Sequence, residues 1–281
     1  VLGIIRDNDD VDEVYNLAAQ SHVGISFQQP ALTWDITGKG CLNLLQALVD
    51  LDMKHARFYQ ASSSEMFGSS YDVDRNGVKY QNEQTKLMPN SPYAIAKTAA
   101  HHAVRIYRDA YGLHASSGIL FNHEGPRRGE NFVTQKIIKW IKGFKYWKEN
   151  VTGNHQPKLD DDNIWINSNS FPRLRLGNLK AFRDWGYAGD YVEAMWLMLQ
   201  QDSADDYVIC TGKTHTIQDF IDISFKEAGI EEFKKTILID PEFYRPCEVD
   251  YLKGDCSKAK EELGWEPKHD LKGLIKLMLN A

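Results

Sequence analysis

A tyrosine and a lysine stand four residues apart, at Tyr93 and Lys97, where apolar residues recur at helical spacing. Such neighbours share one face of a helix, and an ammonium beside a phenol favours the phenolate, so Tyr93 is a candidate general base. With 13 tyrosines present, roughly one such pair is expected by chance, and an ordinary amphipathic helix is the competing interpretation. Ser91 and Pro92 predict that the helix begins there, which places Tyr93 in its first turn.

Hydroxyl groups and a carboxylate follow a second candidate element. Ser62, Ser63, Ser64 and Glu65 come directly after a short apolar stretch that resembles a buried strand. Residues just beyond the carboxyl end of a strand line the ligand crevice of a doubly wound sheet, where a hydroxyl and a carboxylate two residues apart can both reach a sugar. A serine turn that simply ends the strand is the alternative.

The elements that must position these residues alternate in type. Strands are expected at 14–19, 57–62, 115–121 and 206–211, and helices at 34–51, 92–110, 190–201 and 217–228. This alternation predicts an α/β protein with a doubly wound parallel sheet. Residues 145–173 are polar and without periodicity, which predicts a long surface loop that Trp147 and Trp165 anchor.

Composition limits the class of protein. The chain has 281 residues, 42% of them hydrophobic, and a net charge of -6, as in a globular protein of one large or two modest domains. No apolar run reaches the roughly 18 residues of a membrane helix, and the slight acidity argues against nucleic acid as a partner. The four cysteines are scattered, which predicts free thiols, a cytoplasmic location and no metal site, and Asp160 to Asp162 are expected to be solvated.

A glycine-rich turn is missing from the sequence. A dinucleotide-binding sheet opens with a strand, such a turn and a helix N-terminus that binds the pyrophosphate. Neither GxxGxxG nor GxGxxG occurs in this chain. Either the protein does not belong to this class, or the first part of its nucleotide-binding domain precedes the sequence given, and we favour the second interpretation.

Six blocks of sequence resemble those of the GDP-mannose 4,6-dehydratases, which are extended short-chain dehydrogenase/reductase enzymes. In chain order they are VYNLAAQSHV, FYQASSSEMFG, SPYAIAK, FNHEGPRRGENFVTQKI, LGNLKAFRDWGYAGDYVEAMW and RPCEVDYLKGD. The resemblance extends from about Val14 to Pro267, apart from 145–173. The fourth and fifth blocks discriminate best, because the whole superfamily shares YxxxK.

The resemblance implies a Rossmann-like domain at 1–122, with 180–215 returning to it, and a smaller nucleotide-sugar-binding domain at 123–179 and 216–281. It also implies the chemistry. Tyr93 removes the O4 proton of GDP-mannose while hydride passes from C4 to NADP⁺, and Lys97 holds the nicotinamide ribose. Glu65 then removes the C5 proton and helps to expel the C6 hydroxyl as water, and hydride returns to C6. Ser63, which stands where threonine is usual, keeps the hydroxyl that bonds O4.

The same resemblance implies two sets of binding residues. The cofactor set is Leu17, Ala18, Ala19, Gln20, Ser21, Tyr93, Lys97, His123 and Arg128, in which Arg128 would pair with the phosphate that marks NADP. The substrate set is Asn122, Lys136, Arg183, Arg245 and Glu248, in which the two arginines suit a diphosphate. The sequence departs from the family pattern at Leu32, where many relatives have a tyrosine near the nicotinamide. It also departs at Gly125, where serine is usual, and at Gln135, where a basic residue is usual, and both of these lie in the block that resembles the interface loop.

Two other functions stay open from the sequence. One is a related nucleotide-sugar enzyme, either a dTDP-glucose 4,6-dehydratase or a 4-epimerase. An epimerase needs no base at C5, and the glucose enzymes usually pair an aspartate with the glutamate where this chain has Ser64 before Glu65. The other is a non-catalytic binding subunit, which the missing glycine-rich turn keeps open. The PRRGENFVT block resembles a loop used between subunits, so a homo-oligomer, either a dimer or a tetramer, is expected.

Overall fold

A computed structural model of the chain describes residues 1–150, 171–231 and 233–281. Asp160 to Asp162 and Trp165, for which the sequence predicts a solvated and anchored loop, lie outside these ranges. Contacts group the chain into two compact units. The first comprises 1–123, 182–214 and 245–270, and the second comprises 124–181, 215–244 and 271–281.

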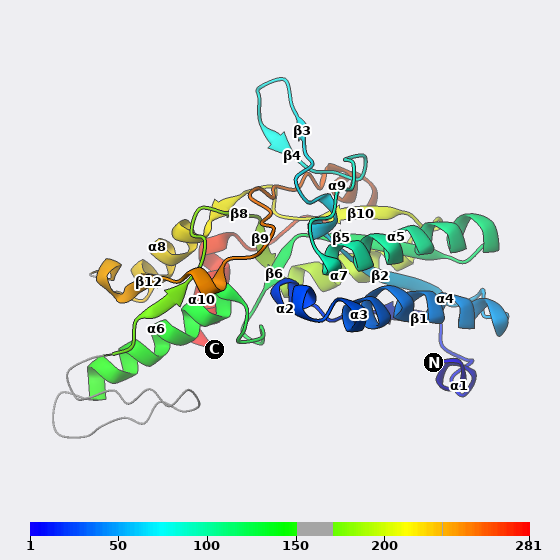
Figure 1. Cartoon of the computed structure of the whole chain (residues 1–281). Coiled ribbons are helices and arrows are strands. Elements are labelled where there is room, and N and C mark those ends of the chain that lie inside the picture. Colours follow the sequence, from blue (N-terminus) through cyan, green and yellow to red (C-terminus); the bar gives the residue numbers. More distant parts are fainter. Residues whose placement is uncertain (151–170, 232) are drawn as a thin grey trace. The chain divides into compact units, whose positions relative to one another are not determined.

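A parallel sheet of four strands organises the first unit (Figure 1). Its strands are β1 (Glu13–Asn16), β2 (Arg57–Ser63), β5 (Ala115–Leu120) and β10 (Asp206–Ile209), in that spatial order. Because all four run in the same direction, their carboxyl ends meet at one edge, where ligands bind in open α/β sheets. The predicted α/β class with a parallel sheet is confirmed.

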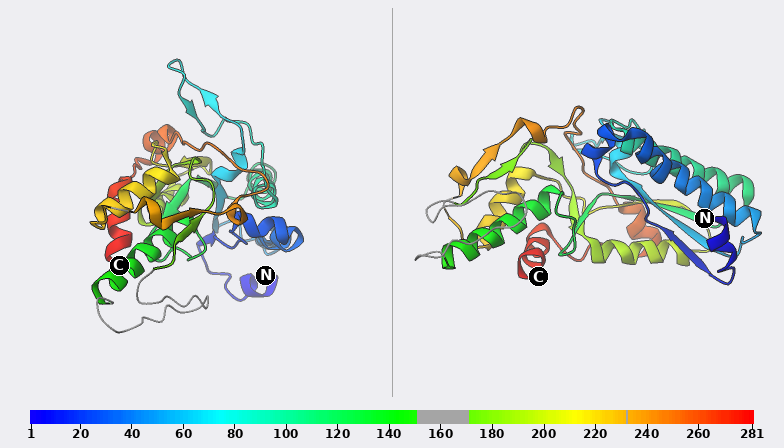
Figure 2. Two further views of the ribbon diagram at one scale, coloured as in Figure 1. Left: turned by 60° about the vertical axis from the view of Figure 1, so that its left-hand side comes forward. Right: turned by 60° about the horizontal axis from the view of Figure 1, so that its bottom comes forward.

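Helices cover both faces of this sheet (Figure 2). Phe58 packs in a core cluster with α4 (Gly40–Asp50) and α5 (Pro92–Tyr111), whereas its neighbour Tyr59 packs in a cluster with α7 (Ala188–Gln200). Successive side chains of a strand point to opposite faces of the sheet, so Phe58 and Tyr59 belong to the cores on opposite sides of β2. Burial on both faces is the usual condition of a parallel sheet.

Local sequence determines where α5 begins and ends. The Ser91 hydroxyl accepts a hydrogen bond of 3.1 Å from the amide of Ala94, and Pro92 occupies the first helical position, where its missing amide hydrogen costs nothing. Gly112 ends the helix in the left-handed conformation, with φ of 71°. The prediction of a helix over 92–110 is therefore confirmed, with its first turn next to the carboxyl edge of the sheet.

Other predicted elements need adjustment. The strand expected at 14–19 ends at Asn16, because the chain leaves the sheet there. The helix expected at 34–51 is a π-helical turn, Trp34–Lys39, followed by α4. The first unit also contains α1 (Leu2–Arg6), α2 (Val23–Gln28), α3 (Pro30–Thr33), α9 (Ser257–Leu263) and the short strands β3 (Asp72–Val73), β4 (Lys79–Tyr80), β8 (Phe182–Arg183) and β9 (Trp185–Tyr187).

The second unit is built on three helices, α6 (Val133–Asn150), α8 (Ile217–Glu227) and α10 (Leu271–Asn280), which contact one another. It also contains a parallel pair, β7 (Leu174–Leu176) and β12 (Ile237–Ile239), and the short strand β11 (His215–Thr216), and β6 (Asn122–Glu124) leads into it. The prediction of a loop from residue 145 is wrong for 145–150, which continue α6. Trp147 lies in this last turn of α6 and packs against Phe144 and Phe171.

Residues 245–270 make their contacts in the first unit, although the sequence groups them with 216–281. Trp265 is buried there and donates a hydrogen bond of 2.8 Å to the carbonyl of Asp190 in α7. The amide of Leu252 donates a hydrogen bond of 3.2 Å to the carbonyl of Phe182. The described helices include none with both the length and the apolar character to cross a membrane.

Candidate active site

Tyr93 and Lys97 lie in the first turns of α5, and both are buried. The Lys97 ammonium donates a hydrogen bond of 2.6 Å to the carbonyl of Ala61 in β2 and lies 5.9 Å from the centre of the Tyr93 ring. Burial lowers the pKa of Lys97 to about 8, and the nearby Cys41 opposes this only in part. The cation is thus held between the phenol and β2, and it stays charged at neutral pH.

Ser63 and Glu65 occupy the turn that follows β2. The Ser63 hydroxyl accepts a hydrogen bond of 3.2 Å from the amide of Glu65 and caps a short 3-10 helix, Ser64–Phe67. Gly68 ends this turn with φ of 56°, and a side-chain carbon there would stand 1.7 Å from the Met88 carbonyl oxygen. Only glycine fits that close approach, so the turn that carries Glu65 depends on glycine at position 68. The Ser63 hydroxyl proton is still available to a ligand, because Ser63 acts as an acceptor in this bond.

Four charged side chains form a continuous chain of ion pairs beside this turn. Glu65 lies 3.2 Å from Arg245, Arg245 lies 3.6 Å from Glu248, and Glu248 lies 2.9 Å from Arg183. The sequence predicts a catalytic role for Glu65 and substrate-binding roles for the other three. The structure brings all four together, although Glu65 and Arg245 are 180 residues apart in the chain.

The two arginines differ in their freedom to bind a ligand. Arg183 is 5% exposed, and it donates to the Val249 carbonyl at 2.6 Å and to Glu248 at 2.9 Å. Burial lowers the pKa of Arg183, while the carboxylate of Glu65 opposes that effect. The Arg245 side chain is 31% exposed, so it is the more accessible guanidinium of the pair.

The loop after β1 carries the first residues of the predicted cofactor set. Leu17 and Ala18 are exposed, and the side chain of Gln20 is used inside the protein. The side-chain nitrogen of Gln20 donates a hydrogen bond of 3.1 Å to the Thr33 hydroxyl. Its backbone amide donates another hydrogen bond of 3.1 Å to the Thr37 hydroxyl. Gln20 therefore holds the loop against the following helices, and the small side chains of Ala18 and Ala19 leave the backbone open to a ligand.

Asn122 and His123 lie just beyond the carboxyl end of β5. The Asn122 side-chain oxygen is buried and has no hydrogen-bond partner among the residues that the structure describes. A buried acceptor without a partner is costly, which is what a ligand donor would relieve. His123 contacts the Phe121 carbonyl through Nδ1 at 2.9 Å and stacks on Tyr191, with ring centres 5.2 Å apart.

Arg128 and Lys136 belong to the second unit, where each has partners of its own. The Nε atom of Arg128 lies 2.9 Å from Glu124 and its guanidinium lies 3.4 Å from the centre of the Phe132 ring. Glu124 is fully buried, and burial raises the pKa of its carboxyl while Arg128 opposes that rise. Lys136 lies 3.6 Å from the centre of the Phe243 ring. The predicted phosphate contact of Arg128 stays a prediction.

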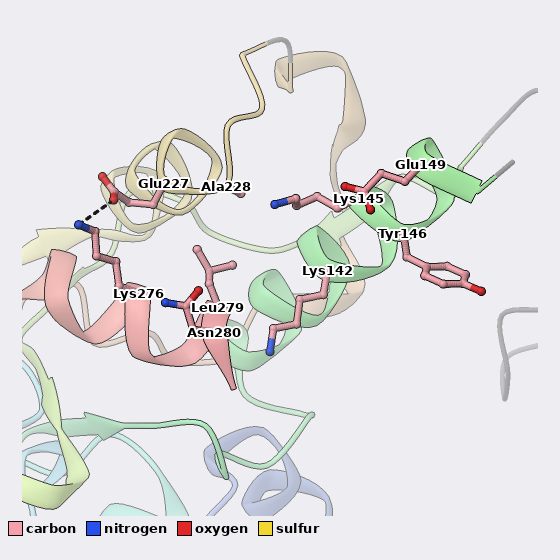
Figure 3. Close-up of a pocket in the computed structure, with 9 residues that line it drawn as sticks. All are labelled: Lys142, Lys145, Tyr146, Glu149, Glu227, Ala228, Lys276, Leu279 and Asn280. Atoms are coloured by element: carbon pink, nitrogen blue, oxygen red, sulfur yellow. Dashed lines mark ion pairs between the residues drawn. The ribbon is translucent and has the colours of Figure 1, made fainter. Parts of the chain in front are cut away.

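A separate cavity of about 560 Å³ lies among α6, α8 and α10 of the second unit (Figure 3). Lys142 and Lys145 from α6, Glu227 and Ala228 from the end of α8, and Lys276 from α10 are among the residues that line it. Glu227 is already paired with Lys276 at 3.5 Å and with Lys272 at 3.1 Å. None of the predicted site residues lines this cavity.

One buried residue in the site region was missed at the sequence level. Asp184 directly follows Arg183 and is 0% exposed, whereas the resemblance gives a role only to Arg183 in the FRDWG segment. An aspartate next to a candidate phosphate-binding arginine was the available signal.

Comparison with known proteins bears out the resemblance. A family model described as GDP-mannose 4,6 dehydratase matches residues 2–161 and 162–278. GDP-mannose 4,6 dehydratase 1 of Arabidopsis thaliana is 48% identical over 272 residues, a match that covers 96% of this chain and 67% of the relative. The GDP-mannose 4,6-dehydratase of Yersinia enterocolitica serotype O:8 is 42% identical over 284 residues, covering 92% of this chain and 69% of the relative.

Solved structures agree with the fold. RMD from Pseudomonas aeruginosa complexed with NADPH superimposes with a TM-score of 0.77 at 25% identity, covering 96% of this chain and 80% of that one. The dTDP-glucose 4,6-dehydratase DesIV from Streptomyces venezuelae, with NAD and TYD bound, gives 0.78 at 22% identity, covering 99% and 76%. The chain spans about two thirds of the length of the relatives named first. On these matches, the chain belongs to the GDP-mannose 4,6-dehydratase family.

Proposed function

We propose that this protein converts GDP-mannose to GDP-4-dehydro-6-deoxy-mannose, as a hydro-lyase with NADP as its resident cofactor. Family membership and relatives named for this reaction support the substrate and the reaction. The structural support for the proposal is that the candidate catalytic residues gather at the carboxyl end of β2. Lys97 is bonded to Ala61 of that strand, and Ser63 at its end fixes the backbone of Glu65.

The residues present fit the nicotinamide half of such a cofactor. Ala18 and Ala19 follow β1 at the edge where β2 ends, and the buried Lys97 cation lies beside the Tyr93 phenol. A likeness to a structure with NADPH supports a nicotinamide dinucleotide. Choice of NADP over NAD rests on Arg128, whose Nε faces Glu124. When bound, the cofactor accepts hydride from C4 of the sugar and returns it to C6.

Each proton in the reaction has a residue to carry it. Tyr93, favoured as phenolate by the Lys97 cation, takes the O4 proton, while the Ser63 hydroxyl donates a hydrogen bond to O4. The ketone that results at C4 acidifies the C5 proton, and Glu65 removes it. Protonated Glu65 then supplies that proton to the C6 hydroxyl, which leaves as water. When hydride returns to C6, C5 takes up a proton, and this balances the proton that Tyr93 removed from O4. The net change is the loss of one water, with no net oxidation.

Arg183 and Arg245 suit the diphosphate of the substrate, because guanidinium groups bind phosphate oxygens through paired hydrogen bonds. Glu248, which pairs with both, is the candidate acceptor for ribose hydroxyls. Asn122 is proposed for the same nucleotide sugar because its buried oxygen lacks a partner among the described residues. Lys136 is proposed for the substrate set on the family resemblance alone.

A homo-oligomer and a cytoplasmic location are also proposed. The PRRGENFVT block resembles a loop used between subunits in this family, which supports the first. All four cysteines are free thiols in the structure, which supports a reducing compartment.

The proposed activity is tested by incubating the protein with GDP-mannose and a catalytic amount of NADP⁺ and following the nucleotide sugar by mass. Loss of one water without accumulation of NADPH is expected. dTDP-glucose and UDP-glucose serve as competing substrates. Dehydration of one of these instead of GDP-mannose would overturn the substrate assignment, and binding without any reaction would favour a non-catalytic subunit.

A further inference from the structure

Asp184 is a fully buried carboxylate whose oxygens are all engaged by neighbouring chain segments. Its Oδ1 accepts hydrogen bonds from the amide of Thr211 at 2.8 Å and from the Thr211 hydroxyl at 2.6 Å. Its Oδ2 accepts from the amides of Gly212 at 3.0 Å and Gly254 at 3.3 Å. Burial raises the pKa of Asp184 to about 6, and these hydrogen bonds oppose that rise, so the group is ionised at neutral pH.

These hydrogen bonds tie together three stretches of chain that meet at the end of β10. At Gly254 the approach is close: a side-chain carbon there would lie 2.4 Å from both Cβ and Sγ of Cys210. A buried carboxylate is expensive to desolvate, so a protein retains one only where its hydrogen bonds are made in full. Asp184 is therefore a junction between 182–184, 210–212 and the turn at Gly254.

Asp184 is linked to both arginines of the ion-pair cluster. Arg183 directly precedes Asp184 in the chain, and it is fastened to Glu248 and to the carbonyl of Val249. Glu248 and Val249 belong to the segment 245–254, which begins with Arg245. At the other end of this segment, the amide of Gly254 donates a hydrogen bond to Asp184. A shift at Asp184 would consequently move Arg183 through the backbone, and Arg245 through the segment that Arg183 holds.

We propose that Asp184 is a positioning residue that sets the spacing of Arg183 and Arg245 for a nucleoside diphosphate. This inference rests on the proposed function, because it gives the two arginines a diphosphate to bind. It assigns Asp184 no contact with the substrate and no part in proton transfer. Its role is to make the two guanidinium groups converge before the ligand arrives, which is how preorganisation contributes to affinity.

The test is Asp184→Asn, which keeps the size of the side chain but turns one acceptor oxygen into a donor. That amide would face backbone N–H groups, so two of the four hydrogen bonds are lost. The matched control is Asp190→Asn in the same unit. Asp190 is also buried, and it accepts from the backbone amides of Lys268 at 2.9 Å and His269 at 3.1 Å, without touching the arginine cluster.

Binding of GDP and of NADP⁺ to both variants and to the wild type is measured by calorimetry, together with kcat and KM for GDP-mannose. For Asp184→Asn we expect the Kd of GDP and the KM to rise about tenfold to a hundredfold, as for lost hydrogen bonds to a charged group, with the Kd of NADP⁺ unchanged. For Asp190→Asn we expect the Kd of GDP to stay within about twofold, although both variants lose stability.

Equal weakening of GDP binding in the two variants would overturn the inference, because a general loosening of the fold would then explain it. So would an Asp184→Asn protein that binds GDP like the wild type. These results are distinct from failure of the proposed function, which would appear as a wild-type protein that binds GDP without dehydrating GDP-mannose. A wild-type protein that does not bind GDP would overturn both.

Discussion

Arg245 Nη1 lies 3.2 Å from Glu65 Oε1, which joins the residue proposed to remove the C5 proton to a residue proposed to bind the diphosphate. Arg245 also lies 3.6 Å from Glu248, so one guanidinium serves two carboxylates. The contact is only partly exposed, and Coulomb attraction at this depth is stronger than between surface charges. The charge of the proposed base Glu65 is therefore coupled to that of Arg245 in the proposed diphosphate site.

Replacement of Glu65 by glutamine removes the proposed base and keeps its shape. We expect kcat for dehydration to fall by about a hundredfold to ten-thousandfold, the usual contribution of a general base. KM is expected to change much less. The measurement is the mass of the nucleotide sugar over time, and Glu266→Gln, an exposed glutamate paired with Lys260, is the control that should be unaffected. Dehydration that survives in Glu65→Gln would remove this role from Glu65.

Replacement of Arg245 by methionine keeps the apolar stem of the side chain but removes the guanidinium and its charge. We expect KM for GDP-mannose to rise about tenfold to a hundredfold, because a charge-assisted hydrogen-bonding partner of the diphosphate is lost. Arg175→Met is a matched control, since Arg175 also pairs with two carboxylates, Asp240 and Glu242, but belongs to neither predicted set. If the two variants show the same KM, Arg245 does not bind the substrate.

Lys97 predicts a pH dependence of activity. Its pKa, lowered to about 8 by burial, means that the cation is present below that pH and is lost above it. Without the cation the Tyr93 phenolate is less favoured. Activity should therefore fall as the pH rises through about 8, in a kcat profile measured at saturating substrate. A rate that stays level up to pH 10 would contradict the proposed partnership of Lys97 and Tyr93.

The same pKa predicts an effect on stability. In the unfolded chain the pKa of Lys97 returns to 10.5, so keeping the charge in the folded state costs on the order of 3 kcal/mol at pH 7. Because the folded pKa is lower, this cost disappears as the pH rises from about 8 to 10.5. Lys97→Met should thus be inactive yet more stable at pH 7 by roughly 1 to 2 kcal/mol, once the lost bond to Ala61 is subtracted.

Urea unfolding at pH 7 and at pH 10 measures this gain, which should shrink at the higher pH. The exposed Lys54→Met is the control and should show no gain at either pH. A Lys97→Met protein less stable than the wild type at pH 7 would show that burial of this charge is not costly.

Ser63 is expected to tolerate a return to the family's usual residue. Ser63→Thr keeps the hydroxyl and should change kcat by less than about threefold, since the added methyl mainly restricts rotamers. Ser63→Ala loses both the proposed bond to O4 and the cap on the Glu65 amide, and it should lower kcat about tenfold to a hundredfold while costing about 1 kcal/mol of stability. Initial rates and thermal unfolding of the pair check this. Equal activity of the two variants would exclude a role for the hydroxyl.

Local features of the sequence were enough to predict the elements that hold the proposed catalytic residues. Ser91 and Pro92 mark the start of α5, and the apolar run at 57–62 matches β2, because capping and burial patterns act over a few residues. The helical continuation at 145–150 was not predictable in this way. Those residues are exposed for the most part and extend a helix whose buried face lies earlier, at Ile137, Ile138 and Ile141.

Contacts between distant parts of the chain could not be predicted from the spacing of residues in the sequence. Nothing in the spacing of Glu65 and Arg245 indicates that they meet, and nothing in Asp184 indicates that Gly254 donates to it. The resemblance identified Glu65 and Arg245 as separate site residues, and only the fold shows that 245–270 pack with the sheet. The residue roles were therefore accessible from motifs, whereas their electrostatic coupling required the structure.

The proposed reaction is an elimination with oxidation and reduction hidden inside it, and isotope transfer tests it most directly. GDP-mannose carrying deuterium at C4 is incubated with the protein and a catalytic amount of NADP⁺, and the product is examined by mass and by NMR. We predict a product that has lost one water and carries the deuterium at C6. Deuterium retained at C4, or released into the cofactor pool as product forms, would contradict internal hydride transfer from C4 to C6.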